Sequence, residues 1–326
     1  SSPLKRGESH PEVITLKENL AKLGFEVTPN PTEQYGVQTE GTVKEFQSYY
    51  GLRVNGIADE RTLAKIEELL GALIDEPLGP GSSGEEVLEM KLKLAELGFS
   101  VSDNPNEVYG PKTEETVKAF QSYYGLPVTG IIDQITVLKV EEVLFSHLRR
   151  GEHHQDAIKL KRDLSKLGFH VTNNPTTSYG PSTEQKVMEF QSHYGLAVNG
   201  IADEVTLAKI EEILNSPLRR GESHPDVIKL KEDLSRLGFH ISNNPTTSYG
   251  VSTEEKVKEF QRAYSLPVSG IADEVTLATI AQAIERLGKE IITYTSYNIS
   301  LAQALSIQMN QLQQTDKYRN EKAYVS

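Results

Sequence analysis

The side chains with chemical potential in this sequence recur at fixed places instead of gathering at one point. A Tyr-Gly pair stands at an equivalent place four times along the chain, with its tyrosine at Tyr35, Tyr109, Tyr179 and Tyr249. A Phe-Gln pair follows each tyrosine and supplies Gln47, Gln121, Gln191 and Gln261. Tyrosine and glutamine are suited to stacking and hydrogen bonding, which indicates binding chemistry.

The groups that catalysis or metal binding would need do not stand out. The chain has no cysteine, and its eight histidines form no His-Glu-x-x-His run. No carboxylate pair or nucleophile departs from the helical surface pattern, and His153-His154 alone is a weak metal candidate. We therefore expect no catalytic residue, no metal site and no cofactor.

Leu-Gly-Phe runs place the recurring residues in a repeat. The runs begin at Leu23, Leu97, Leu167 and Leu237, and the tyrosines that follow lie 70 to 74 residues apart. Self-similarity at a fixed period indicates tandem copies of one supersecondary unit. We expect four modules, numbered 1 to 4 in chain order, at residues 4–77, 78–147, 148–217 and 218–288. Residues 289–326 are expected to form a tail or the start of a further module.

Apolar spacing predicts three helices in each module. In module 1, Val13, Leu16 and Leu20 recur at steps of three and four, as on the buried face of a helix. Gly24 follows where a left-handed residue would end that helix. A second helix follows the Tyr-Gly turn, and a third begins after Asp59, a good N-cap. The sequence therefore predicts an all-α fold of four three-helix bundles in an extended array.

The stretches between modules are short, so we expect neighbouring modules to touch. We place a hinge at residues 79–84, which are rich in glycine and serine. Ser265 stands where modules 1 to 3 have glycine after the second helix, which suggests a different cap in module 4. In the tail we expect one helix from Leu301 to Leu312.

The charge and hydropathy of the chain exclude some partners. The formal net charge of -12 disfavours nucleic acid, which is itself a polyanion. No apolar run approaches the ~20 residues of a membrane-spanning helix. The chain starts at Ser1 without a methionine, so we expect a processed form or a fragment.

An ordered string of motifs gives the chain a family likeness. In module 1 it reads Leu-x-x-Gly, Val-x-x-Leu-x-x-x-Leu-x-x-Leu-Gly-Phe, Tyr-Gly-x-x-Thr-x-x-x-Val-x-x-Phe-Gln and Gly-Leu-x-Val-x-Gly-Ile, over residues 4–57. This string resembles the type 1 peptidoglycan-binding domain, a three-helix module attached to many bacterial cell-wall hydrolases. The likeness covers almost all of residues 4–287. The loop at residues 30–34 departs from it, because family members often carry Asp-Gly there.

The resemblance implies a secreted, cell-wall-associated monomer that binds peptidoglycan through the glycan strand or the stem peptide. Four weak modules on a repetitive polymer gain from effective concentration, and they would target an attached wall hydrolase. The absence of tryptophan favours weak binding or recognition of the peptide. Two alternatives stay open: a helical spacer or protein-interaction scaffold, and part of a glucosaminidase or amidase whose catalytic module lies outside this chain.

Four kinds of position are candidates for ligand contact. For the Tyr-Gly tyrosines, packing and ligand contact are equally favoured. For the glutamines we favour a structural role, in which the amide holds the Tyr-Gly loop. Tyr49 and Tyr123 point away from the core and could stack on a ligand. A small polar residue precedes a glycine in each module, at Asn55, Thr129, Asn199 and Ser269. Turn formation is favoured for these four. We expect a groove between the Tyr-Gly turn and this loop, beside the start of the second helix.

Overall fold

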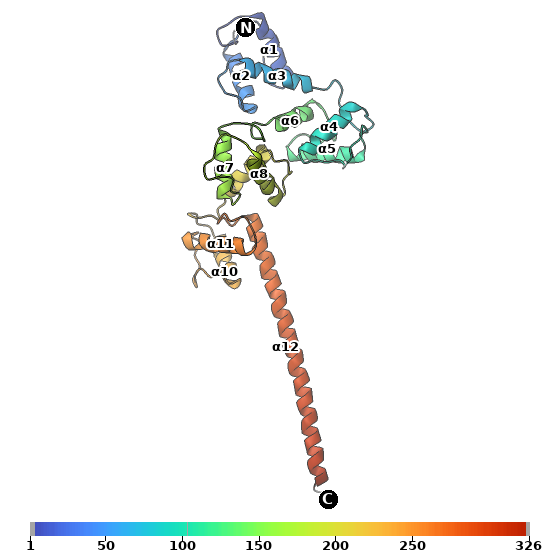
Figure 1. The fold of residues 1–326 in the computed structure, drawn as a ribbon, viewed down its shortest axis with the longest axis vertical. Helices are drawn as coiled ribbons and strands as arrows, with labels where there is room; N and C mark the ends of the chain where they lie inside the picture. Colours follow the sequence, from blue (N-terminus) through green and yellow to red (C-terminus); the bar gives the residue numbers. More distant parts are fainter. Residues whose placement is uncertain (1–3, 103, 324–326) are drawn as a thin grey trace. The chain divides into compact units, whose positions relative to one another are not determined.

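The chain folds into helices joined by loops (Figure 1). The structure is a computed structural model that describes residues 4–102 and 104–323 and contains twelve α-helices in that range. Extended pairing among these residues is limited to isolated β-bridges. The chain divides into two compact units, with the boundary between Leu214 and Asn215. These observations confirm the predicted all-α fold of tandem helical modules.

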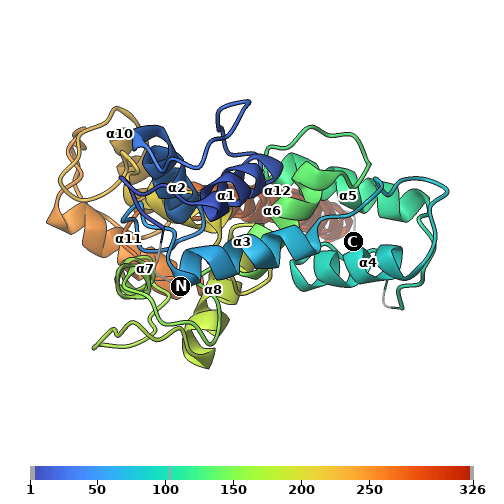
Figure 2. The same ribbon diagram turned by 90° about the horizontal axis from the view of Figure 1, so that it is seen from above.

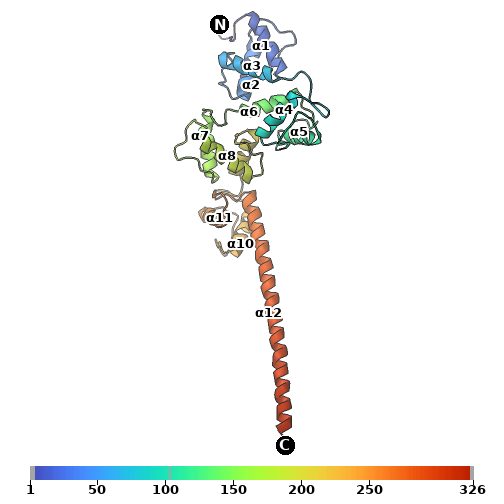
Figure 3. The ribbon, with the colours of Figure 1, turned by 45° about the vertical axis from the view of Figure 1, so that its right-hand side comes forward.

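Each module contributes three consecutive helices. Module 1 contains α1 (Pro11–Lys22), α2 (Val37–Tyr49) and α3 (Glu60–Ala72). Module 2 contains α4 (Glu85–Glu96), α5 (Pro111–Tyr123) and α6 (Gln134–Leu144), which lie together in Figure 2 and Figure 3. Module 3 contains α7 (Asp156–Lys166), α8 (Pro181–His193) and α9 (Glu204–Leu214). Module 4 contains α10 (Asp226–Arg236), α11 (Val251–Ala263) and α12 (Glu274–Ala323).

The first helix of module 1 ends as its sequence predicts. Gly24 has a φ of 87°, in the left-handed region, and the N–H of Phe25 donates to the carbonyl of Leu20 at 2.9 Å. This bond satisfies one carbonyl that the end of the helix leaves without a partner. The ring of Phe25 then meets the edge of Phe46, with 5.2 Å between ring centroids. The cap therefore also directs an aromatic side chain onto the second helix.

The third helix begins at its predicted N-cap. One carboxylate oxygen of Asp59 accepts the N–H of Thr62 at 2.9 Å and the hydroxyl of Thr62 at 2.8 Å. Asp133 holds Thr136 in the same way in module 2. A cap of this kind typically contributes about 1 kcal/mol.

The modules keep separate hydrophobic cores, and those of modules 1 to 3 meet at their edges. Modules 1, 2 and 4 each have a cluster of buried apolar side chains, and module 3 buries the corresponding Leu164 and Phe190 completely. Leu138 of module 2 packs against the core of module 1. Ile201 of module 3 joins the core of module 2. Modules 1 to 3 therefore touch, as their short joints predict.

The glycine-rich stretch at residues 79–84 forms a turn inside module 2, where we expected a hinge. Leu78 exchanges two backbone hydrogen bonds with Ile132, at 2.8 and 3.0 Å. The N–H of Gly84 donates to Glu107 at 2.9 Å, and Ser82 accepts the N–H of Tyr109 at 3.0 Å. The glycines allow the chain to turn tightly here, since Gly81 and Gly84 both have positive φ.

The tail continues the last helix of module 4. The predicted helix at Leu301–Leu312 is part of α12, which runs without a break for 50 residues (Figure 1). No glycine or proline follows Gly288, so nothing in the sequence ends the helix there. Ile280 and Ala283 lie in the module core, whereas the large apolar side chains between Ile291 and Leu312 are exposed. Among the described helices, none joins enough length to enough apolar character to cross a membrane.

Module 4 keeps the cap of the other modules despite its serine. Ser265 has a φ of 55°, close to the 67° to 70° of Gly51, Gly125 and Gly195. The N–H of Leu266 still donates to the carbonyl of Gln261 at 2.8 Å. The prediction of a different cap is therefore wrong, because the surrounding hydrogen bonds hold the serine in a conformation that costs L-residues energy.

We expect Ser265→Gly to raise the free energy of unfolding by about 0.5–1 kcal/mol, because glycine adopts positive φ without steric cost. The matched change Gly195→Ser is expected to lower it similarly, since a Cβ at Gly195 would meet no atom within 4 Å. Urea unfolding followed by circular dichroism measures both changes. Unaltered unfolding in both variants would contradict the assigned strain.

Candidate functional site

The tyrosine of each Tyr-Gly pair points into its module. Tyr35, Tyr109, Tyr179 and Tyr249 are at most 2% exposed. The hydroxyl of Tyr35 donates to the carbonyl of Gly56 at 2.6 Å, and the other three make the same bond to Gly130, Gly200 and Gly270. Burial raises the pKa of these hydroxyl groups well above the usual value of about 10. The rings tie the Tyr-Gly turn to the loop before the third helix, and their predicted ligand contact stays a prediction.

The glutamine after each buried phenylalanine fastens that same loop. In module 1, Oε1 of Gln47 accepts the N–H of Asn55 at 3.0 Å and of Gly56 at 2.9 Å. Its Nε2 donates to Ile57 at 2.9 Å and to Thr62 at 3.0 Å. Gln121, Gln191 and Gln261 repeat these bonds in the other modules. The amide therefore holds the loop before the third helix, whereas we expected it to hold the Tyr-Gly loop.

The small polar residue of that loop shapes the turn from within. Oδ1 of Asn55 accepts the N–H of Ile57 at 2.9 Å. The side chains of Thr129, Asn199 and Ser269 accept the N–H two residues on in the same way. Such a side chain mimics a backbone turn, which agrees with the turn-forming duty favoured from sequence. Ligand contact by these four residues stays a prediction.

A buried lysine that the sequence analysis missed supports the opposite side of the Tyr-Gly turn. Lys17 is 6% exposed, and its Nζ donates to the carbonyls of Thr32 at 2.9 Å and Gln34 at 2.8 Å. Burial lowers the pKa of Lys17 from its ordinary value. Lys91, Lys161 and Lys231 occupy the same position and also bind loop carbonyls. The sequence does contain a sign of this role. In all four copies a lysine directly follows the same apolar core position of the first helix, as Lys17 follows Leu16.

A polar groove lies beside the start of α2 in module 1. It has a volume of about 310 Å³ and runs between the loop at residues 27–34 and the first turns of α2. Thr28, Asn30 and Gln38 offer it exposed polar side chains, and Lys17 and Thr39 form part of its wall. We expected a groove beside the start of the second helix. It lies on the side of the Lys17-held loop and not on the side of Asn55.

The asparagine of this groove recurs in every module. Asn30, Asn104, Asn174 and Asn244 are all exposed and all precede a proline. Among the described residues, the Asn30 side chain has no hydrogen-bond partner. An exposed amide that is repeated while the residue before it varies is a better candidate for ligand contact than a buried one. From sequence we treated this loop only as a departure from the family pattern.

The two exposed tyrosine candidates lie at contacts between modules. The hydroxyl of Tyr49 donates to Oε2 of Glu142 in module 2 at 2.7 Å. Burial, followed by the neighbouring Glu142, raises the pKa of Tyr49 to about 12. The hydroxyl of Tyr123 accepts the N–H of Ala197 in module 3 at 3.2 Å. Both rings therefore have a role in joining modules, and their stacking on a ligand stays a prediction.

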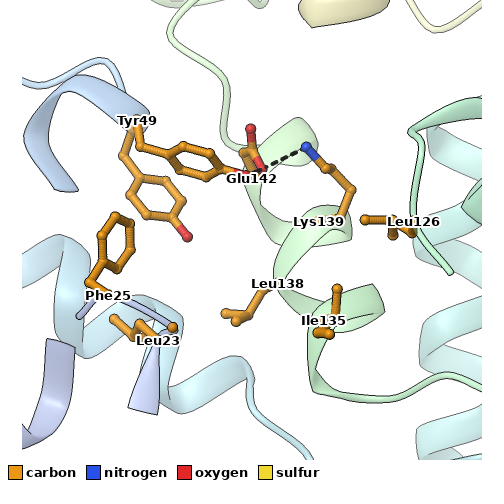
Figure 4. Close-up of a pocket in the computed structure, with 10 residues that line it drawn as sticks. Leu23, Phe25, Tyr49, Leu126, Ile135, Leu138, Lys139 and Glu142 are labelled. Carbon is orange, nitrogen blue, oxygen red and sulfur yellow. Dashed lines mark hydrogen bonds and ion pairs between the residues drawn. The ribbon is translucent and has the colours of Figure 1, made fainter. Parts of the chain in front are cut away.

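Figure 4 shows the cleft that modules 1 and 2 form around Tyr49. Its volume is about 300 Å³, and Phe25 and Leu138 line it with apolar surface. The polar groups at its edge already pair with one another, since Nζ of Lys139 lies 3.1 Å from Glu142. We read the cleft as a packing seam between two modules, because its charged groups are satisfied within the protein.

We expect Gln191→Leu to lower the free energy of unfolding by about 2–4 kcal/mol, because the buried N–H of Gly200 loses its acceptor. The neighbouring Ser192→Ala, on the exposed side of α8, should change it by less than about 0.5 kcal/mol. Urea unfolding of both variants compares them. Equal stability of the two would show that the glutamine is dispensable for the loop.

Comparison with known proteins agrees with this architecture. The chain is 30% identical over 161 residues to the N-acetylmuramoyl-L-alanine amidase CwlM of Mycobacterium tuberculosis, which covers 44% of this chain and 39% of that protein. It is also 30% identical over 164 residues to the N-acetylmuramoyl-L-alanine amidase CwlL of Bacillus licheniformis, covering 43% of this chain and 46% of that protein. The chain thus matches less than half the length of these relatives.

The family model described as "Putative peptidoglycan binding domain" matches the chain four times, at residues 9–66, 83–139, 153–210 and 223–280. Each match spans the three helix starts of one module, together with its Tyr-Gly turn and its glutamine-held loop. The matches cover well over half of the sequence, and the chain therefore belongs to the peptidoglycan-binding domain family as a tandem array of four copies.

Proposed function

We propose that each module contacts peptidoglycan through the polar groove beside the start of its second helix. The observation that carries this proposal is the exposed asparagine that all four modules place at the same point of the loop before the Tyr-Gly turn, which lines the groove in module 1. The loop is held from beneath by the buried lysine of the first helix, so the amide is presented by a rigid support. A preorganised polar group loses less conformational entropy on binding.

The start of the second helix adds backbone donors to the groove. The N-cap of α2, α5, α8 and α11 is a glycine, at Gly36, Gly110, Gly180 and Gly250, and no side chain accepts a hydrogen bond as the cap. α5 and α8 begin with proline, which has no N–H, so the donors open to a carbonyl or carboxylate of a ligand are the N–H groups of the residues that follow it in the first turn. The groove thus combines amide and backbone donors at one place.

We propose that this combination reads the stem peptide in preference to the glycan strand. Stem peptides present amide and carboxylate groups, which pair with the donors described above. Glycan binding commonly uses a flat exposed aromatic ring. The chain has no tryptophan, and Tyr35, Tyr109, Tyr179 and Tyr249 of the Tyr-Gly turns are buried.

We further propose that the array is non-catalytic and secreted, acts as a monomer, and directs an attached hydrolase to the cell wall. Both relatives named above are amidases by name, which supports a hydrolase as the attached partner. The recurring polar residues of the modules hold loops and joints, and this distribution supports binding over catalysis. The module boundaries given from sequence also remain our proposal.

A scaffold for another protein is the second candidate function. The contacts among modules 1 to 3 favour it, because they build a rigid multi-module body of the kind that helical repeats present to partners. It differs from wall binding in one outcome, since a scaffold has no affinity for purified sacculi.

Replacing the groove asparagine by alanine in one, two, three and four modules of the full chain tests the proposed site. Each silenced module is expected to lower the apparent affinity for purified sacculi about tenfold or more, because avidity depends on the number of working modules. Sedimentation with sacculi measures the bound fraction. The control variant carries alanine at Ser48, Ser122 and Ser192, which are exposed near the ends of α2, α5 and α8.

Full binding by the four-asparagine variant would reject the groove while leaving wall binding intact. Failure of the unaltered chain to sediment would favour the scaffold. Soluble stem peptide should release the bound chain, and glycan strands stripped of peptide should not. Release by the stripped strands alone would show that the glycan is read.

The proposed absence of catalysis has its own test. Incubation of the chain with sacculi should release no reducing sugar and no free amine, since the modules hold no recurring catalytic set. The unaltered chain mixed with a known wall hydrolase serves as the positive control for both assays. Release of either product by the chain alone would make it an enzyme.

A further inference from the structure

The joint between modules 2 and 3 gathers three metal-ligating side chains. His147 lies in the joint itself, and His154 and Asp156 stand at the start of α7. One ring nitrogen of each histidine and a carboxylate oxygen of Asp156 lie within 4.8 Å of one another. No other group of three such residues meets this condition in the part of the chain that the structure describes. We expected no metal from the sequence, in which His154 stands beside His153 and seven residues from His147.

The distances within this group are close to those of a zinc site. Nε2 of His147 lies 2.9 Å from Oδ2 of Asp156, and Nδ1 of His154 lies 3.4 Å from the same oxygen. The centroids of the two imidazole rings are 4.2 Å apart. Ligand bonds of about 2.0–2.2 Å in a tetrahedron place ligand atoms roughly 3.4 Å apart. Small side-chain movements would therefore bring all three groups to one ion.

Module 1 helps to fix the orientation of the key ring. A Cβ built on Gly51 would lie 2.3 Å from Nδ1 of His147, so the imidazole packs directly against the backbone of that glycine. Nε2, on the other side of the ring, faces Asp156. The approach of module 1 thus directs one nitrogen of His147 toward the carboxylate, as a preformed ligand would be.

Helix capping explains one of the histidines but not the other. Nδ1 of His154 accepts the N–H of Asp156 at 3.1 Å, and His10 and His224 cap the first helices of modules 1 and 4 in the same way. His147 has no such duty, and module 4 has Pro217 in its place. Module 4 therefore keeps the pair of His224 and Asp226, 3.6 Å apart, without a third ligand.

We propose that His147, His154 and Asp156 bind a borderline divalent cation, Zn²⁺ foremost. Two imidazoles and one carboxylate suit zinc, and a fourth position stays open to water. Ligation through Nδ1 of His154 exchanges its cap bond for a metal bond. Because the ligands come from the joint and from α7, and His147 also rests on Gly51, the ion would lock modules 1 to 3 in their present contact.

Isothermal titration of the full chain with ZnCl₂ tests this proposal. We expect one saturable site per chain and a rise in the thermal unfolding midpoint of the residue 1–214 unit on adding zinc. His147→Gln and Asp156→Asn should each weaken zinc binding by more than about tenfold. Asp156 is exposed, so its variant leaves the fold intact.

Two matched variants serve as controls, His153→Gln beside the site and Asp226→Asn at the equivalent pair of module 4. Both should bind zinc as the unaltered chain does. Absence of a saturable site in the unaltered chain would overturn the proposal. So would equal binding by Asp156→Asn and the unaltered chain, or loss of binding in His153→Gln. Co²⁺ as a spectroscopic probe adds a second readout, since the proposed site predicts the visible absorption of tetrahedral cobalt, absent in His147→Gln.

Discussion

A primary amide has two donors and two acceptor lone pairs, and it is costly to bury unless they are used. In every module the glutamine after the core phenylalanine is buried with its oxygen and nitrogen both engaged by the loop before the third helix. The loop in turn accepts the hydroxyl of the buried tyrosine. Backbone bonds from Tyr35 to Gly7 and Glu8 extend this connection to the segment before the first helix. The loops of the module are thus held by buried side chains and a few backbone bonds, since the described residues form isolated β-bridges and no sheet.

The copies differ where they meet one another. Tyr124 is 7% exposed because Asp203 of module 3 covers it and accepts its hydroxyl at 2.6 Å. Asp203 also caps α9 through Thr206, so one carboxylate serves both the helix and the joint. Tyr264, the equivalent residue of module 4, is 37% exposed. Burial of this tyrosine therefore depends on its neighbour and not on the module alone.

The helices and most of their ends follow from the sequence, because their determinants are local, and the end of α12 is the exception. The spacing of Val13, Leu16 and Leu20 sets the buried face of α1, and Asp59 caps α3 by the rule for that residue type. Whether the ring of Tyr35 is buried or exposed was not predictable, because a Tyr-Gly turn is compatible with either direction of the ring. Lys17 was missed because its residue type normally indicates the surface, and only tertiary contact shows the carbonyls it binds.

Contacts between modules lay beyond sequence reasoning for a different reason. In an isolated module Tyr49 would lie on an exposed helix face. It joins two modules only because Glu142 of module 2 accepts its hydroxyl hydrogen bond. The repeat period of about 70 residues gives the number of modules but not which side chains of two modules come into contact. The groove beside α2 was expected in roughly the right place, but its side was misjudged. The lysine-held loop that forms its wall was not recognised as a unit.

The unbroken course of α12 gives module 4 a property that the others lack. Its first turns belong to the core of the module, and its later turns leave that core without a loop between them. A continuous helix transmits rotation, since each peptide is hydrogen-bonded to the next turn. Because the helix is continuous, a tilt of module 4 would swing the far end of α12 through a larger arc than the module itself.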